Sequence, residues 1–197
     1  MSIARRSRTA IAAFVKRMSF TIHLWLTHRR HSQPRRDFLC ETNDEISIKI
    51  PALPRPTLAD VRGDYPCNYP YISKIVRDFS PSGPVTLRLA TVLNKGELSV
   101  GGPEYQRRLV LSGLWRLLGF QQLAWIVAHQ DDYPVFLSFL GEFSIDGSAL
   151  TVIDENGVEN TPYICKNNGT GRWDLKFAPI WSPTSRFDRR CRVATAG

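Results

Sequence analysis

Residues 149–164 read ALTVIDENGVENTPYI, which places two runs of strand-forming residues on either side of Asn156-Gly157. Asn-Gly is the dipeptide that tight hairpin turns favour, because both residues tolerate a positive φ. The runs 149–153 and 158–164 are therefore expected to pair as an antiparallel hairpin. This stretch predicts an antiparallel sheet in the C-terminal half of the chain.

Further strand signals lie on both sides of this hairpin. Asp146-Gly147 is a second turn, and the run 142–145 before it is expected to be a strand. Pro134 opens the run 135–140, which has the composition of a strand, and a last strand is expected over 173–177.

The first half of the body combines helix and strand signals. Residues 46–50 alternate strictly between apolar and polar and predict a strand, and Thr57 is expected to cap a short helical turn over 57–61. The runs 71–79 and 85–93 fit either a helix or a strand. A loop is expected at 101–105, followed by apolar runs at 109–120 and 122–128 in which Trp115 and Trp125 are expected to be buried.

The composition divides the chain into three parts. Residues 1–43 are expected to be a basic arm, partly helical or flexible, and residues 44–178 an α+β core. Residues 179–197 are rich in Pro, Ser and Arg and are expected to be a loose tail. The predicted fold class is α+β: a single compact domain with an antiparallel sheet and a few helices, preceded by a basic amphipathic N-terminal arm.

All of the net charge of the chain lies in its first 40 residues. They hold nine basic residues and one acid, whereas the remaining residues hold 17 basic and 17 acidic ones. The whole-chain charge of +8 is therefore the charge of an arm attached to a neutral body. A localised charge of one sign is suited to binding a polyanion, which means nucleic acid, anionic lipid, or both.

The arm also carries an apolar stripe at helical spacing, from Ile11 to Leu26. A basic helix with Phe14 and Trp25 on its apolar face can lie in a lipid interface. Two other uses stay open: docking of the helix on its own core, and phosphate binding by a flexible arm. The residues expected to bind membrane or polyanion are Arg5, Arg6, Arg8, Phe14, Lys16, Arg17, Trp25, Arg29, Arg30, Arg35 and Arg36.

Motifs for catalysis and metal binding are missing from the sequence, including nucleophile elbows, zinc-protease motifs and phosphate-binding glycine loops. His129 near Asp131-Asp132 has the residue types for acid–base work, but a solvated loop is the simpler interpretation. His28, His31 and Cys40 lack a fourth metal ligand and lie among arginines. We therefore expect no catalytic residues, no metal and no cofactor, and a binding or structural protein in place of an enzyme.

The compartment is indicated by the cysteines and by the N-terminus. Four widely spaced cysteines favour a reducing environment, and no apolar run is long enough for a membrane span or a secretory signal. A mitochondrial presequence stays open, because residues 1–36 are Arg-rich and contain no acid.

A series of short patches occurs in a suggestive order. They are Ser47-Ile48-Lys49-Ile50, residues 55–61, Gly83-Pro84 followed by residues 85–93, Gly102-Pro103-Glu104-Tyr105, and residues 134–143 followed by 150–155. In this order, over about residues 44–165, the chain resembles the matrix proteins of rhabdoviruses. The Pro-Pro-x-Tyr budding motif that is frequent in that family is absent here.

The resemblance implies a viral matrix protein, a structural constituent of the virion that drives assembly and budding. It implies peripheral binding to the anionic inner leaflet of the envelope, contact with the viral nucleocapsid, and self-association into a homo-oligomer. The implied locations are the virion matrix, the host cell cytoplasm and host membranes.

Two further expectations accompany this resemblance. Tyr69-Pro70-Tyr71-Ile72 resembles a Tyr-Pro-x-hydrophobic late motif that recruits host membrane-scission machinery, although a turn packed by aromatic rings explains it as well. The alternative function is a nucleic-acid-binding viral protein, of the capsid or RNA-silencing suppressor type, that binds RNA through its arginine-rich arm.

Overall fold

The computed structural model of the chain describes residues 39–42, 46–63, 71–180, 186–188 and 190–197. All of them belong to one compact unit, Arg36–Gly197, which is the body of the protein. The expectations for the arm fall almost entirely on residues outside this description.

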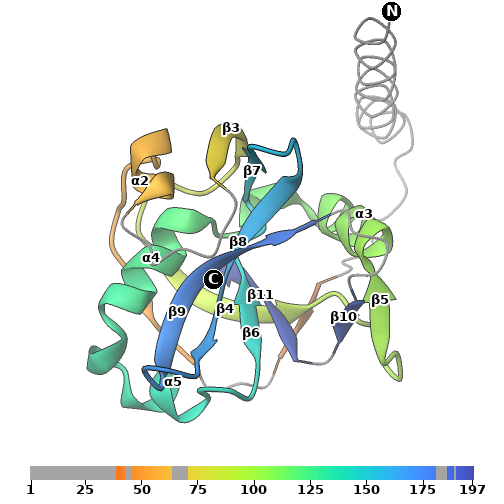
Figure 1. Ribbon diagram of the computed structural model, residues 1–197. Coiled ribbons are helices and arrows are strands. Elements are labelled where there is room, and N and C mark those ends of the chain that lie inside the picture. The colour runs from red at the N-terminus through yellow and green to blue at the C-terminus, as the bar shows by residue number, and fades with distance from the viewer. Residues whose placement is uncertain (1–38, 43–45, 64–70, 181–185, 189) are drawn as a thin grey trace, which may run out of the picture. The chain divides into compact units, whose positions relative to one another are not determined.

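The centre of the body is a nine-stranded sheet (Figure 1). Its strands are β1 (Cys40–Glu41), β2 (Lys49–Ile50), β3 (Ile72–Asp78), β4 (Val85–Thr91), β6 (Ser144–Asp146), β7 (Leu150–Asp154), β8 (Glu159–Asn167), β9 (Arg172–Pro179) and β11 (Cys191–Ala196). The order across the sheet is β1-β4-β11-β6-β8-β7-β3, with β2 also on β4 and β9 also on β8. Every pair is antiparallel except β11 with β6.

Short helices and a small second sheet complete the body. The helices are α2 (Leu58–Arg62), α3 (Gly102–Ser112), α4 (Phe120–Ala128) and α5 (Pro134–Ser138), with 3-10 turns η1 (Leu114–Arg116) and η2 (Gln130–Asp132). Strands β5 (Ser99–Gly101) and β10 (Arg186–Asp188) form an antiparallel pair. The predicted α+β fold with a mainly antiparallel sheet in a single compact domain is confirmed.

The predicted hairpin is strands β7 and β8, joined by the turn at Asn156-Gly157. The N–H of Gly157 donates to the carbonyl of Asp154 at 3.0 Å, and Gly157 alone in the turn has a positive φ, +79°. The Asp154 carboxylate accepts the N–H groups of Asn156 and Val158, both at 2.9 Å. An Asp side chain that satisfies turn amides in this way fixes the turn, and the glycine supplies the left-handed residue that closes it.

Strand β8 links the two halves of the sheet. Along one edge it pairs with β9 from Asn160 to Asn167. Its other edge is divided, because Glu159 and Asn160 pair with β7 whereas Tyr163 and Ile164 pair with β6. The hairpin is thereby joined to the strands that come before and after it in the sequence.

The expectation of a loose C-terminal tail is wrong for residues 191–196. They form β11, which lies in the interior of the sheet between β4 and β6. Val193 and Ala194 are fully buried. The preceding Pro-, Ser- and Arg-rich segment dominates the composition of the tail, and the partners of β11 lie far back in the chain, in β4 and β6, so local sequence carries little sign of this strand.

Residues 85–93, for which helix and strand were both open, contain strand β4. Its side chains alternate between two cores on opposite faces of the sheet. Leu87 and Leu89 pack with the α4 side chains Leu123 and Ile126, in what we call the α4 core. Ala90 and Val92 pack with Tyr105 and Leu109 of α3, in the α3 core. Figure 1 shows α4 and α5 gathered on the side of the molecule away from α3.

Several local predictions are confirmed. Thr57 caps α2 in a reciprocal capping box with Asp60. The run 71–79, for which helix and strand were both open, contains strand β3. Residues 173–177 lie within β9, and residues 142–145 overlap β6. In 46–50 only Lys49–Ile50 is strand, but the alternation is real, because Ile46, Ile48 and Ile50 are buried whereas Ser47 and Lys49 are exposed.

Four other local predictions need correction. Residues 134–138 form helix α5 in place of a strand, because Pro134 at the first helical position has its φ already set and needs no donor there. In place of the loop expected at 101–105, Gly101 ends β5 and residues 102–105 form the first turn of α3. Leu39 is buried and β1 pairs with β4, so the core begins before residue 44. Trp125 is only partly buried, and the side chain of Trp115 lies outside the description.

The position of β11 predicts a large difference between two valines. Val193→Ala removes apolar volume from the α3 core and is expected to lower the free energy of unfolding by about 2 kcal/mol. Val158→Ala, at a position that is 41% exposed, is the matched control and should change it by less than about 0.5 kcal/mol. Urea unfolding monitored by Trp fluorescence measures both, and equal effects would contradict an interior position of β11.

Candidate functional site

Helix α3 carries the most connected polar side chains of the described residues. Pro103 and Glu104 stand in its first turn, where a fixed φ and a negative charge both favour a helix start. Glu104 and Arg108 are four residues apart and so lie on the same helix face. The adjacent side of the helix carries Tyr105 and Leu109, which are both fully buried.

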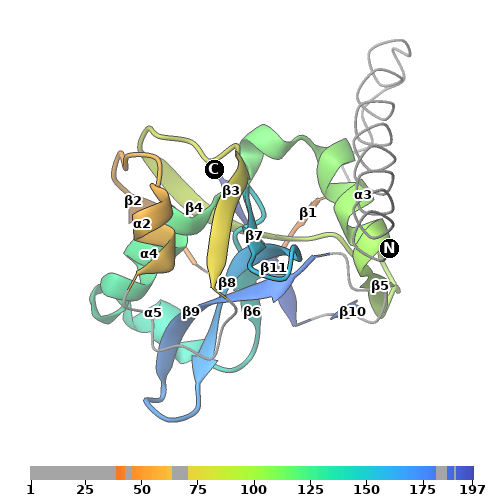
Figure 2. The same cartoon turned by 45° about the horizontal axis from the view of Figure 1, so that its top comes forward.

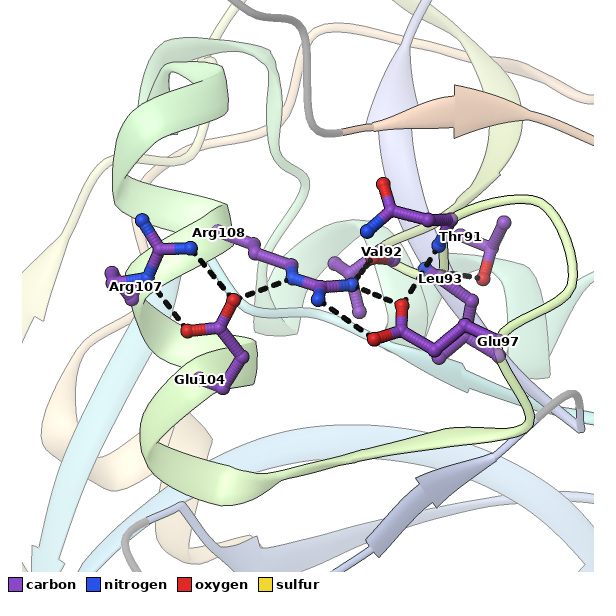
Figure 3. Close-up of polar contacts among 8 residues, drawn as sticks. Thr91, Val92, Leu93, Glu97, Glu104, Arg107 and Arg108 are labelled. Atoms are coloured by element: carbon purple, nitrogen blue, oxygen red, sulfur yellow. Dashed lines mark hydrogen bonds and ion pairs between the residues drawn. The ribbon is translucent and has the colours of Figure 1, made fainter.

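Arg108 ties α3 to the loop between β4 and β5 (Figure 3). Its side chain is only 7% exposed and makes a two-pronged ion pair with Glu97, at 2.5 and 2.8 Å. It also donates to the Glu104 carboxylate at 2.8 Å and to the carbonyl of Val92 at 2.6 Å. The Glu97 carboxylate in turn accepts the N–H of Asn94 at 2.9 Å. One guanidinium therefore fixes both ends of the loop.

The charges in this network stabilise one another. Hydrogen bonding from Arg108 lowers the pKa of Glu97. Arg107 is the main cause that lowers the pKa of Glu104 to about 2, with Arg108 adding to it. Hydrogen bonding to Glu97 raises the pKa of Arg108. The Arg107–Glu104 pair is at the surface and contributes little, whereas the buried Arg108 would leave an uncompensated charge if its partners were removed.

The loop that Arg108 fixes borders a shallow groove of about 480 Å³. One wall is β1 and the residue after it, and the other is the β4–β5 loop. Leu98 is the last residue of this loop and is 68% exposed, the highest value for a large apolar side chain among the described residues. The groove is lined by Cys40, Glu41, Thr42, Thr91, Leu93, Asn94, Lys95, Gly96, Glu97 and Arg192.

A second polar cluster lies inside the domain, where α3 meets β6 and β11. The Tyr105 hydroxyl donates to the Asp146 carboxylate at 2.6 Å and lies 3.1 Å from the Ser148 hydroxyl. The Cys191 thiol donates to the same carboxylate oxygen at 3.4 Å. Burial raises the pKa of Asp146 to about 6, and burial next to Asp146 raises the pKa of Tyr105 well above its usual value.

A second groove, of about 650 Å³, has mixed charge. It is lined in part by Glu142, Lys166 and Arg190, at the junction of α5 and strands β6 and β8. Neither groove presents a run of cations of the kind that a polyanion requires. Among the described residues, no group of three His, Cys, Asp or Glu side chains is placed to hold a metal ion.

The site residues predicted from the sequence fall into two groups. All those of the arm, from Arg5 to Arg36, lie outside the described residues, as do Tyr69 and Pro70 of the late motif. Tyr71 is 55% exposed and the Arg62 guanidinium lies over its ring at 4.2 Å. Ile72 is 5% exposed and begins β3, and its carbonyl accepts from Arg62 at 2.8 Å.

His129 and the neighbouring acids are engaged separately. The His129 Nδ1 lies 2.8 Å from the carbonyl of Trp125, and its ring stacks on the Trp125 ring at 4.2 Å. Asp131 pairs with Arg172 at 2.6 Å on the surface. These contacts are those of a helix end and a surface loop, which agrees with the simpler interpretation of this segment.

Sequence reasoning did not identify Glu97, Tyr105, Arg108 or Asp146. The one local signal was the spacing of Glu104 and Arg108, which is common on solvated helices. Nothing local marks Asp146 as buried, because it occurs in an Asp-Gly turn signal that usually lies at the surface. The partners of both Arg108 and Asp146 include residues from distant segments.

No described helix has both the length and the apolar character that crossing a bilayer requires. Comparison with known proteins gives no match: no family model, no curated protein and no solved structure aligns with the chain. The function is therefore inferred from the residues and their arrangement.

The buried Asp146 predicts a definite pH dependence of stability. Its pKa is raised from 3.8 to about 6 on folding, so its ionisation destabilises the fold progressively as the pH rises from about 4 to about 6. Asp146→Asn keeps an acceptor for Tyr105 and removes the charge. Relative to wild type, this variant should gain up to about 3 kcal/mol of unfolding free energy between pH 4 and pH 7.

Asp131→Asn is the control for this measurement. Arg172 lowers the pKa of Asp131, so the contribution of this surface carboxylate has the opposite sign and is lost as the pH falls below its ordinary value. Urea unfolding at a series of pH values measures both variants. An Asp146→Asn difference that does not change with pH would contradict a buried, ionising carboxylate.

Proposed function

We propose that this chain is a structural protein of the viral matrix type. Its arm binds peripherally to the anionic inner leaflet of a membrane, and its body self-associates and contacts the viral ribonucleocapsid, so that the two together drive assembly and budding. The corresponding locations are the virion matrix, the host cytoplasm and the cytoplasmic face of host membranes.

The observation that carries this proposal is the division of charge between arm and body. Each Lys or Arg near an anionic leaflet contributes about 1 kcal/mol of attraction, and the arm has nine of them. The stripe with Phe14 and Trp25 adds apolar burial in the interface. Charge and apolar insertion together give stable peripheral binding, whereas one of them alone gives marginal binding.

The neutral body supports the self-associating part of the proposal. A body with a strong net charge would repel its own copies in a lattice, whereas one with 17 basic and 17 acidic residues outside the first 40 does not.

One specific observation favours a second candidate function, which is binding of RNA. Eight of the nine basic residues of the arm are arginines. The planar guanidinium forms two-pronged hydrogen bonds with phosphate, which lysine does not. A capsid or silencing-suppressor type of protein would use the arm in this way.

Recruitment of host membrane-scission machinery through Tyr69-Pro70-Tyr71-Ile72 stays a proposal, and it requires that the motif be accessible to a partner. Tyr71 is accessible. Ile72, however, is buried in β3, where it pairs with Asp154 of β7. A partner that needs the apolar side chain at the fourth position of this motif would have to detach the start of β3.

Co-sedimentation of the full chain with anionic vesicles, neutral vesicles and RNA tests the proposal. Deletion of residues 1–36 should abolish binding to anionic vesicles, and binding by the full chain should fall with salt. The double variant Phe14→Ser, Trp25→Ser keeps every charge of the arm. It should weaken vesicle binding at least about tenfold and leave RNA binding unchanged.

Each outcome separates the two candidate functions. Unchanged vesicle binding after the deletion would contradict the membrane role of the arm. Vesicle binding that is indifferent to the double variant, together with arm-dependent RNA binding of steep salt dependence, would favour the nucleic-acid function.

A further inference from the structure

A groove and an exposed apolar side chain lie next to each other at one edge of the sheet. Strand β1 is the last strand on that edge, and its residues Cys40 and Glu41 line one side of the 480 Å³ groove, with Thr91 of β4 and Arg192 of β11 beside them. The β4–β5 loop forms the other wall as far as Glu97, and Leu98 is the next residue in the chain. A projecting leucine beside a hollow lined mainly by apolar atoms is a knob beside a hole.

The loop that carries Leu98 is fixed by hydrogen bonds within one copy of the chain. Glu97 is fixed by two hydrogen bonds from Arg108 and by the N–H of Asn94 (Figure 3). Gly96, with a φ of +86°, supplies the left-handed residue that turns the loop back. A rigid loop loses little conformational entropy when it binds, so an apolar contact made by Leu98 is not offset by ordering.

The charges around the groove are of both signs. Among its lining residues Glu41 and Glu97 are negative, and Lys95 and Arg192 are positive. Glu97 is already paired with Arg108, whereas Glu41 and Lys95 are exposed and make no ion pair in the part of the chain that the structure describes. Glu41 stands on the β1 wall and Lys95 on the loop wall.

We infer that two copies of this chain meet at this groove about a two-fold axis, with Leu98 of each copy inserted into the groove of the other. In a two-fold contact, if one surface point touches a second, the second also touches the first on the partner. A knob and a hole that lie side by side satisfy this rule. The same arrangement brings the Lys95 ammonium of each copy to the Glu41 carboxylate of the other.

The arrangement of charge favours a second copy over other ligands. A polyanion would meet the Glu41 carboxylate in the groove, and an uncharged apolar ligand would gain nothing from Lys95 or Glu41. A second copy supplies one leucine, one cation and one anion in matching positions. The inference rests on the self-association included in the proposed function, and it assigns that property to a surface.

Charge reversal tests the contact in the full chain, kept free of nucleic acid and lipid. Sedimentation equilibrium should show dimers of the wild type. Lys95→Glu and Glu41→Lys should each lower the association constant at least about tenfold, because each variant opposes like charges at two symmetric places. Lys49→Glu, an exposed lysine on β2, is the matched control and should associate as the wild type does.

Mixing the two reversed variants is the sharpest part of the test. One partner then carries Glu at 95 and at 41, and the other carries Lys at both, so both contacts are complementary. The mixture should form dimers that neither variant forms alone. A mixture that associates no better than its components would overturn the inference.

A covalent test probes the knob itself. Under a mild thiol oxidant, Leu98→Cys should form an intermolecular disulfide with the native Cys40 that lines the partner's groove, and the double variant Leu98→Cys, Cys40→Ser should not. Dimers equal in amount for both variants would contradict the placement of Leu98.

The two proposals fail separately. A wild-type chain that binds anionic vesicles through its arm but stays monomeric at high micromolar concentration would overturn this inference and leave the membrane role standing. If substitutions at positions 41, 95 and 98 leave the association constant unchanged, the choice of surface is overturned and self-association itself stands. A wild-type chain that does not bind anionic vesicles, but forms dimers that the charge reversals weaken, would contradict only the membrane role.

Discussion

The insertion of β11 between β4 and β6 is the constraint on which the rest of the body depends. Antiparallel pairing joins it to β4, with β1 and β2 beyond, and parallel pairing joins it to β6, with β8, β7, β3 and β9 beyond. Figure 2 shows β11 at the centre of the strands that it connects. Val193 on one face and Ala194 on the other belong to the two different cores. The last residues of the chain thus close a sheet whose other strands are formed earlier in the sequence.

Helix α3 connects the central strands of the sheet to the surface loop between β4 and β5. Through Tyr105 it is anchored to Asp146 on β6, which also accepts from Cys191 on β11, in the buried cluster. Through Arg108, one turn further along, it fixes the loop that borders the groove. The loop that carries Leu98 is thus connected through α3 to the central strands of the sheet. In the proposed function, the body supplies a preorganised contact surface and the arm supplies attraction to a polyanion.

The features that sequence reasoning predicted correctly are those that neighbouring residues determine. The Asn156-Gly157 turn, the Thr57–Asp60 capping box and the buried alternation of Ile46, Ile48 and Ile50 each depend on a few consecutive residues. Strand β11, the Arg108–Glu97 pair and the buried Asp146 depend on partners in other segments of the chain. Helix α5 was predicted as a strand because its apolar residues suit either structure, and only packing decides.

In the proposed function the arm binds the membrane while the body remains folded and available for contacts between copies. Hydrogen exchange of the full chain, measured free and on anionic vesicles, distinguishes the two parts of the molecule in one experiment. Vesicles should protect the amides of residues 11–26 and leave those of β8 and β9 unchanged. Protection of the body with unchanged exchange in the arm would contradict this division of roles.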